Sequence, residues 1–362
     1  MKERRKRNMS RTGLLFMFCL LMLCGCAQIT GFMENTEVSG REVESLAAEK
    51  EDDTVLLGGM PVGIYMETDG VLVLDTEKMT GMDGKEYTPA QGVVSSGDYI
   101  TEVNHQKIEG KKQLMDLVEH LDGEKVLLTV RRENTILEKK LTPVQISKGN
   151  YRLGMWVRGN VQGLGTITFL TKNNRFAALG HGIHDIDTST LLTIKRGTLY
   201  RTSIQKVQKG SKGNPGTMEG IIVYNRFHQL GVIEKNTDAG IYGELNSDRS
   251  WIGEEVPIQV AKKEEIKTGE ARIRCYIDGE VKEYTICITQ IDKESDQVNK
   301  GMVIQVTDTE LLEKTGGIIQ GMSGSPIIQN GKLIGAVTHV FVQDSTKGDC
   351  IIIENRLKEE ES

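Results

Sequence analysis

The sequence predicts a mainly β protein in which a compact unit precedes a larger all-β part, and three observations support this prediction. Short apolar runs rich in β-branched residues recur along the chain and are broken by glycine, of which there are 40 against 6 prolines. Long amphipathic helices are nearly absent from the sequence. The chain has 362 residues, which is enough for two or three domains.

The first 26 residues are typical of an export signal. Residues 1–12 are basic, and Gly13–Cys26 is an apolar run of 14 residues. A spanning helix needs about 20 residues, so this run is short for one. The ending Leu23-Cys24-Gly25-Cys26 resembles a bacterial lipobox, which makes Cys26 a candidate for lipidation; an uncleaved signal anchor is the alternative. Either way, the basic flank stays in the cytoplasm and we expect the rest of the chain to be exported.

Charge is unevenly distributed along the chain. Residues 1–26 hold six Lys or Arg and one acid, which leaves 39 basic and 50 acidic residues beyond them. A body this acidic argues against nucleic-acid binding as the main function. Residues 27–54 carry eight acids against two bases and little apolar periodicity, so we interpret them as a solvated linker.

Residues 55–145 are expected to form a compact unit. Strands are predicted at Gly70–Asp75, within Ser96–Asn104 and at Val126–Arg131, and a helix at Lys111–His120. The Gly-Asp-Tyr-Ile-Thr-Glu-Val-Asn run at 97–104, followed by one helix and a Leu-Thr-Val-Arg strand, resembles a PDZ domain. His105 departs from the glycine usual at that position.

PDZ domains bind the C-terminus of a peptide as an added strand at a sheet edge. The candidate terminus-binding loop consists of Gly59, Met60, Pro61, Val62, Gly63 and Ile64. The alternative is a unit that only docks onto its neighbour.

Residues 146–362 are numerous enough for a double β-barrel. Short β-rich runs occur at residues 165–169, 220–224, 286–289 and 302–306. Of the cysteines in this part, Cys275 and Cys287 could pair across a hairpin, and Cys350 is the third. No C-x-x-C pair occurs, so neither a zinc nor a redox site is expected.

One serine lies in a glycine-rich segment that suits nucleophilic catalysis. The segment is Gly316-Gly-Ile-Ile-Gln-Gly-Met-Ser-Gly-Ser-Pro-Ile327, with Ser323 at its centre. The glycines allow a tight turn in which the N–H groups of Gly321 and Ser323 converge as an oxyanion hole. This resembles the nucleophile loop of chymotrypsin-like proteases; a purely structural Gly/Ser turn is the alternative.

A nucleophilic serine needs a base, and there are six histidines to consider. His181 follows Phe176-Ala-Ala-Leu-Gly180, small apolar residues that suit a strand end at the rim of a barrel, so it is the first candidate. His105 and His120 lie in the PDZ-like unit, while His184 and His228 lack such a context. His339 is expected in a core or a pocket wall.

The acid that orients the base should lie between the histidine and the serine in the order of chymotrypsin-like proteases. Asp185, Asp187, Asp238 and Asp308 all satisfy this condition. Asp185 and Asp187 also suit capping of the loop after His181. Asp308 follows an apolar strand, which is a good place for a fixed carboxylate.

Taken together, the chain resembles the SpoIVB peptidase family of sporulation serine proteases. The matching runs are Leu153–Arg158, Gly163–Phe169, Ala178–Ile183, Thr315–Pro326 and Leu333–Phe341. The resemblance implies a chymotrypsin-like double β-barrel preceded by a PDZ domain. It also implies that Ser323 is the nucleophile, His181 the general base and Asp308 the orienting acid, with no metal or organic cofactor.

The resemblance further implies a signalling role. Such a protease is exported into the space between the forespore and mother-cell membranes, processes itself, and cleaves a membrane-bound regulator of an intramembrane metalloprotease. That cleavage activates a late mother-cell sigma factor. One alternative is a quality-control protease of the HtrA type, in which the protease domain precedes the PDZ domain. The other is a non-catalytic PDZ scaffold.

Overall fold

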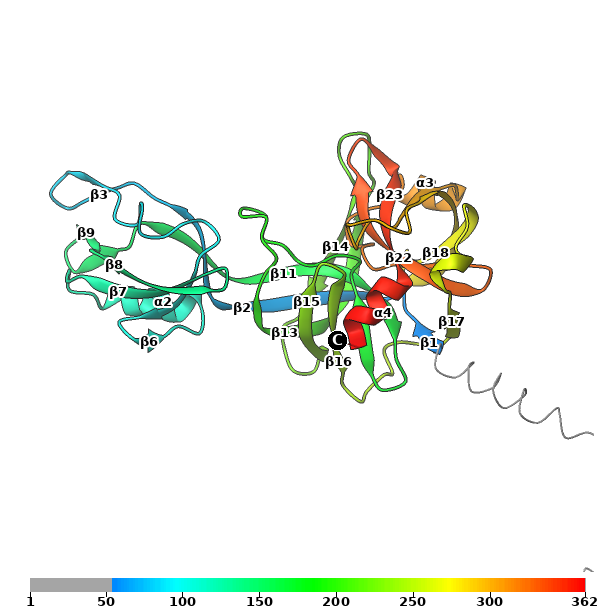
Figure 1. Cartoon of the computed structure of the whole chain (residues 1–362), viewed down its shortest axis with the longest axis horizontal. Helices are drawn as coiled ribbons and strands as arrows, with labels where there is room; N and C mark the ends of the chain where they lie inside the picture. Colours follow the sequence, from blue (N-terminus) through cyan, green and yellow to red (C-terminus); the bar gives the residue numbers. More distant parts are fainter. Residues whose placement is uncertain (1–53, 362) are drawn as a thin grey trace, which may run out of the picture. The chain divides into compact units, whose positions relative to one another are not determined.

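The computed structural model describes residues 54–361, and most of its elements are strands, which confirms the predicted mainly β fold (Figure 1). The predicted export segment with Cys26 lies outside the described residues, as does the acidic linker up to residue 53. No helix within residues 54–361 has both the length and the apolar character needed to cross a membrane.

The PDZ-like unit is built around one helix and a small antiparallel sheet. Helix α2 spans Lys111–Glu119, one residue shorter than predicted, and buries Leu114 in the unit's core. The other elements are β3 (Met79–Thr80), β4 (Glu86–Tyr87), β5 (Tyr99–Val103), β6 (Gln106–Lys107), β7 (Val126–Arg132), β8 (Thr135–Leu141), β9 (Val144–Ser147) and β10 (Asn150–Arg152). Alternate residues of β7, namely Val126, Leu128 and Val130, are buried, as the strand period of two requires.

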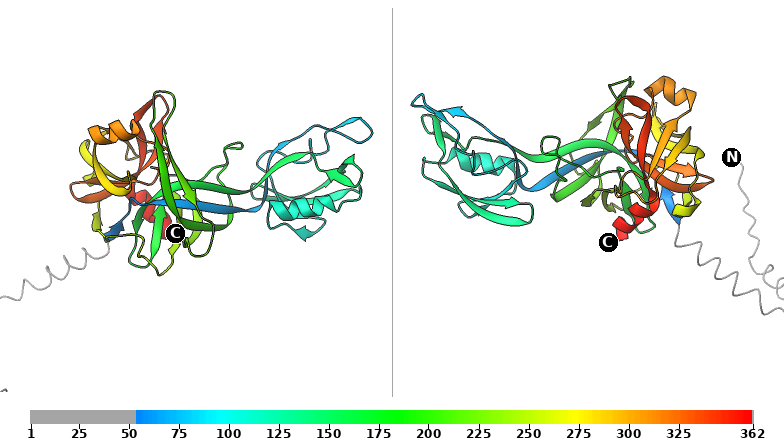
Figure 2. Two further views of the ribbon diagram at one scale, coloured as in Figure 1. Left: turned by 180° about the vertical axis from the view of Figure 1, so that it is seen from behind. Right: turned by 45° about the horizontal axis from the view of Figure 1, so that its top comes forward.

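Two long strands serve both the PDZ-like unit and the first barrel. Strand β2 (Pro61–Thr76) pairs antiparallel with β11 (Met155–Leu170), from Thr76 opposite Met155 to Pro61 opposite Thr166. At one end they contribute to the PDZ-like core, and at the other to the core of the first barrel. Figure 2 shows this pair of strands, blue and green, from two further sides.

The predicted terminus-binding loop is wrong. Gly59, Met60, Pro61, Val62, Gly63 and Ile64 lead into and form the start of β2, which pairs with β11 on one side and β13 on the other. Val62 and Ile64 are almost completely buried in the first barrel, so this segment has no free edge for a peptide.

The predicted boundary at residue 55 is also wrong, because residues 55–66 pack with the barrels. Conversely, Leu153 packs in the PDZ-like core, beyond the predicted boundary at 146.

The first barrel closes with six strands, in the order β2, β13, β15, β16, β12, β11 and back to β2. Its further strands are β12 (Arg175–Ala178), β13 (Ile194–Gln208), β15 (Gln229–Thr237) and β16 (Gly240–Leu245), with β14 (Thr217–Ile222) paired to β13. Strand β1 (Thr54–Leu57) pairs with β11 and β17.

The second barrel also closes with six strands, in the order β18, β19, β20, β23, β22, β21 and back to β18. Its elements are β17 (Pro257–Val260), η1 (Lys263–Glu265), β18 (Gly269–Ile277), β19 (Glu280–Ile291), β20 (Met302–Val306), α3 (Thr309–Thr315), β21 (Pro326–Gln329), β22 (Lys332–Phe341), β23 (Asp344–Ile352) and α4 (Ile353–Glu361). Two closed barrels confirm the predicted double β-barrel. Cys275, Cys287 and Cys350 are free thiols, so the possible Cys275–Cys287 pair does not form.

Candidate active site

Ser323 lies in the turn between α3 and β21 of the second barrel, and the glycine beside it explains the turn. Gly324 has a φ of +94°, and a Cβ there would lie 2.1 Å from the Thr166 carbonyl oxygen of β11. The backbone can therefore approach the first barrel only with glycine at this position. Thr166 N–H donates to the Ser323 carbonyl at 3.0 Å, which fixes the nucleophile segment against β11.

The N–H groups predicted to form an oxyanion hole have no partner among the described residues. The N–H groups of the adjacent Met322 and Gly324 donate to Ile319 and Val337, whereas those of Gly321 and Ser323 donate to no described acceptor. Two free N–H groups on either side of one turn are what a developing oxyanion needs. The oxyanion hole at Gly321 and Ser323 stays a prediction, for which both donors are available.

The Ser323 hydroxyl meets the segment that carries His181. The Gly180 N–H donates to Ser323 Oγ at 3.1 Å, so the residue before the histidine holds the serine oxygen. Ser323, His181 and His339 line one cleft of about 480 Å³, which the loop Gly182–Ser189 and the β11 segment Val161–Leu164 also border. The structure thus places the predicted nucleophile and base in one cleft, one from each barrel, with no direct hydrogen bond described between their side chains.

The hydrogen bond of His181 sets which of its nitrogens can act as a base. Nδ1 lies 2.8 Å from the Gly182 carbonyl oxygen, a contact that is favourable only when Nδ1 carries the proton and donates it. Nε2 is then unprotonated and free to accept the serine proton. The ring stacks on His339 with centroids 4.5 Å apart.

The pKa of His181 is lowered to about 4, mainly by burial; the Gly182 carbonyl opposes this shift, and the neighbouring His339, His184 and Arg356 contribute to it. Burial also lowers the pKa of His339. A base with such a low pKa is neutral, and so able to accept a proton, throughout the physiological range.

We expect cleavage to persist in mildly acidic buffer and to fall only near pH 4, because the neutral imidazole is lost only as pH drops through the pKa of His181, which is about 4. His339→Ala should move the acid limb of the profile, which is the fall in rate at low pH, to higher pH, since the substitution exposes His181 to water and removes a like charge. The pH dependence of kcat/KM for both proteins measures the effect. A wild-type limb near 6.5 would contradict it.

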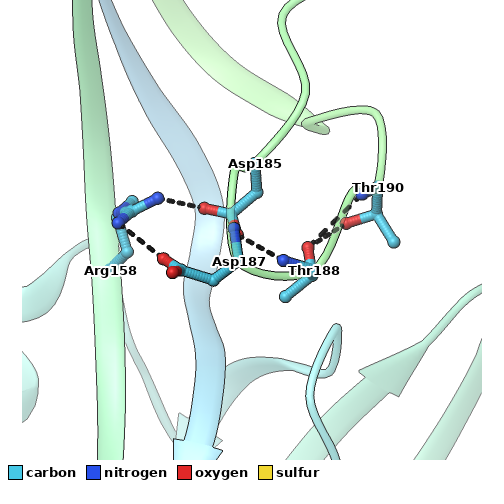
Figure 3. A network of polar contacts seen from close by, with 5 residues as sticks. All are labelled: Arg158, Asp185, Asp187, Thr188 and Thr190. Carbon is cyan, nitrogen blue, oxygen red and sulfur yellow. Dashed lines mark hydrogen bonds and ion pairs between the residues drawn. The ribbon is translucent and has the colours of Figure 1, made fainter.

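The remaining acids near His181 belong to its loop. Asp185 is buried, accepts the N–H groups of Asp187 and Thr188 at 3.0 Å each, and forms an ion pair with Arg158 of β11. Figure 3 shows Arg158 also reaching Asp187, at 2.9 Å. The Asp185 carboxylate therefore caps the loop, the second of the two roles that the sequence left open, and both carboxylates tie the loop to β11 through Arg158.

Asp238 faces a different histidine. Its Oδ1 lies 3.4 Å from Nε2 of His184, whose Nδ1 lies 3.1 Å from the same Gly182 carbonyl that His181 uses. His105 and His120 lie in the PDZ-like unit, and His228 lies in an exposed turn held by Asn225.

The predicted contact of Asp308 with His181 is not formed. The Asp308 carboxylate accepts the N–H groups of Leu311, at 3.1 Å, and Thr285, at 3.2 Å, and so caps the N-terminus of α3. A β-region residue with a carboxylate is a preferred helix cap, which explains why Asp follows β20. In this geometry the Asp308 carboxylate caps α3, and α3 leads directly into the glycine-rich segment that contains Ser323.

Substitutions at Asp308 distinguish a cap from an orienting acid. We expect Asp308→Ala to lower the free energy of unfolding by about 1 kcal/mol and to slow cleavage, whereas Asp308→Asn, itself a good cap, should be milder on both counts. An orienting acid would make Asn as damaging as Ala, with a loss of roughly 10⁴ in kcat. Urea unfolding curves and cleavage rates of both Asp308 variants test the distinction. Asp238→Asn is the control, and its cleavage rate should fall about tenfold or less.

Sequence reasoning missed the backbone groups of the site. The Gly180 N–H and the Gly182 carbonyl hold Ser323 and His181, and no side-chain pattern reports such contacts. Within residues 54–361, no group of three or more His, Cys, Asp or Glu side chains is placed to hold a metal ion.

Several known proteins are similar to parts of this chain. A family model described as SpoIVB peptidase S55 matches residues 149–357. A Helicobacter pylori (strain J99) protein named as a zinc metalloprotease is 30% identical over 144 residues, which is 36% of this chain; the chain spans 40% of that relative's length.

Among solved structures, the PDZ domain of an SdrC-like protein from Listeria monocytogenes is 23% identical, with a TM-score of 0.20, covering 25% of this chain and 87% of that one. The Rv3671c protease of M. tuberculosis in its active form is 15% identical, with a TM-score of 0.29, covering 55% of this chain and 72% of that one. The HtrA-type protease AlgW with a decapeptide is 12% identical, with a TM-score of 0.32, covering 58% of this chain and 53% of that one.

Proposed function

The chain belongs to the SpoIVB peptidase S55 family and is a serine peptidase, and from this premise we propose that it is an exported endopeptidase that cleaves itself and a membrane-bound protein. One observation carries the proposal: Ser323 and His181 line one cleft, beside N–H groups that have no partner in the described part of the chain. The basic and apolar N-terminus supports export, and the family supports self-processing.

In the proposed reaction, Nε2 of His181 takes the Ser323 proton as Oγ attacks the peptide carbonyl. The N–H groups of Gly321 and Ser323 stabilise the oxyanion, and the proton passes to the leaving amine. Water then attacks the acyl-enzyme, with His181 again as the base. The Gly182 carbonyl keeps the imidazole in the required tautomer throughout.

The proposed substrate in the cell is a membrane-bound regulator of an intramembrane metalloprotease, whose cleavage leads to activation of a late mother-cell sigma factor. The family supports this finer role. In a spore-forming host, a sigma-factor reporter should respond to the wild-type chain and stay silent with Ser323→Ala. A reporter that responds to both variants would contradict the signalling role.

Self-cleavage is tested most directly on purified protein. Intact mass should show fragments after incubation of the wild type and none for Ser323→Ala. A fluorophosphonate probe should label the wild type at Ser323; a wild type that neither labels nor cleaves would favour a non-catalytic scaffold.

Globomycin sensitivity and a diacylglyceryl mass on Cys26 would distinguish a lipoprotein from a signal anchor.

We propose that the PDZ-like unit captures the C-terminus of a peptide at β11 rather than at the loop predicted from sequence. The only strand described as pairing with Met155–Arg158 is β2, so one edge of this segment is free for an added strand. Met155 and Val157 are partly buried against the core of the PDZ-like unit, and so are Leu117, Val118 and Leu121, which lie in and just after α2. These provide an apolar site for a terminal side chain.

A binding titration with a labelled C-terminal peptide tests this location. Val118→Gln should weaken binding at least tenfold, by analogy with the loss of a buried apolar contact. Ile136→Gln, at an exposed position on β8 of the same unit, should bind as the wild type does. Equal binding by the two variants would place the peptide elsewhere.

A further inference from the structure

Arg356 of α4 is a fully buried cation with no carboxylate partner. Its exposed fraction is 0%, and no acidic side chain within residues 54–361 forms an ion pair with it. Burial lowers its pKa, as expected for a charge taken out of water. A charge buried in this way is costly unless hydrogen bonds compensate it, so the contacts of its guanidinium show what it stabilises.

The guanidinium reaches the two segments that form the active site. One terminal nitrogen donates to Thr168 Oγ1 of β11, and that hydroxyl donates in turn to the Gly324 carbonyl at 2.6 Å. Gly324 follows the nucleophile directly. The other terminal nitrogen donates to the Ala178 carbonyl at 3.1 Å, at the end of β12 and three residues before the general base.

The surroundings of Arg356 fix the guanidinium in place. It lies over the rings of Phe169 and Tyr242, at 5.9 and 5.7 Å from their centroids. The backbone of Gly240 approaches so closely that a Cβ there would lie 3.1 Å from a terminal nitrogen of Arg356. The Nε atom has no partner within the described residues, so the terminal nitrogens carry the polar contacts.

We propose that Arg356 is a positioning residue of the peptidase, a clamp from α4 that holds the His181 and Ser323 segments at a fixed separation. The inference rests on the proposed function, because it requires these two residues to be the reacting pair. Each segment comes from a different barrel, and a shift of about 1 Å between reacting groups can cost a hundredfold in rate. One side chain that binds both segments limits such a shift.

The same charge acts on the base. His181 is faced by His339 from β22, His184 from its own loop and Arg356 from α4, and each lowers its pKa. Of these, Arg356 alone is always charged. Its removal should therefore raise the pKa of His181, a change that a purely structural anchor of α4 would not produce.

The test measures the rate at which a fluorophosphonate probe labels Ser323, as a function of pH, in full-length folded protein. Arg356→Met and Thr168→Val should each label about ten- to a hundredfold more slowly than the wild type. Only Arg356→Met should also move the acid limb to higher pH, because Thr168→Val retains the charge. The two losses should be less than additive when combined, since both break one chain of hydrogen bonds.

Arg175→Gln is the matched control. Arg175 also holds α4, through Glu360 at 3.0 Å, but it contacts neither catalytic segment. The probe should label Ser323 of the Arg175→Gln protein at the wild-type rate, and the acid limb of its pH profile should be unchanged. Equal labelling by Arg175→Gln, Arg356→Met and Thr168→Val would overturn the clamp. Should Arg356→Met not fold, wild-type labelling of Thr168→Val alone overturns it. A wild type that does not label overturns the proposed function itself.

Discussion

Ser323→Ala should abolish peptide cleavage while leaving both barrels folded. The substitution removes the oxygen that attacks the carbonyl, and in a well-studied serine protease the loss of the nucleophile costs roughly 10⁶ in kcat. The fold should survive, because Ser323 Oγ accepts a single hydrogen bond, from the Gly180 N–H. Cleavage of a peptide substrate followed by mass spectrometry measures the loss, and circular dichroism verifies the fold.

Ser325 provides a control two residues away. Its side chain is fully buried, and its hydroxyl has no hydrogen-bond partner within the described residues. Ser325→Ala removes the same atom from the same turn, so it should retain most of the activity. Cleavage by Ser323→Ala at the rate of Ser325→Ala would exclude Ser323 as the nucleophile.

Much of the fold could be predicted because local patterns carried it. The period of 3.6 residues placed α2 to within one residue, and the glycine-broken apolar runs indicated barrels. The strand pairing that closes the first barrel could not be predicted in detail, because β2 and β11 pair over a sequence separation of about 90 residues. The same pairing explains the error at Gly59–Ile64: a glycine-rich run before a PDZ-like strand looks like a loop, yet here it is held in a barrel on both sides.

The candidate site also contains some residues that the sequence could predict and others that it could not. Ser323 and His181 were accessible from sequence, because tight turns and strand ends leave glycine signatures around them. Asp308 was placed by chain order and by resemblance, which cannot distinguish a carboxylate facing a histidine from one that caps a helix. The Gly182 carbonyl and Arg356 left no local signal, because a backbone acceptor has no identity in the sequence and α4 lies far along the chain.

His181→Gln should reduce cleavage as severely as Ser323→Ala, and the double variant should lose little more, since nucleophile and base act as a unit. His184 is the natural competitor, because it has an acid partner in Asp238 and borders the same cleft. Two contacts favour His181. The residue before it donates to Ser323 Oγ, and its own Nδ1 donates at 2.8 Å, leaving Nε2 free. The Nε2 of His184 is instead directed at Asp238, at 3.4 Å.

The two histidines are therefore distinguished by matched variants. His184→Gln should lose about tenfold or less, as a residue that only supports the loop, and His228→Gln, in an exposed turn, should match the wild type. Single-turnover rates of the three variants, with unfolding curves to verify stability, provide the comparison. A silent His184→Gln beside an active His181→Gln would transfer the role of base to the His184–Asp238 pair.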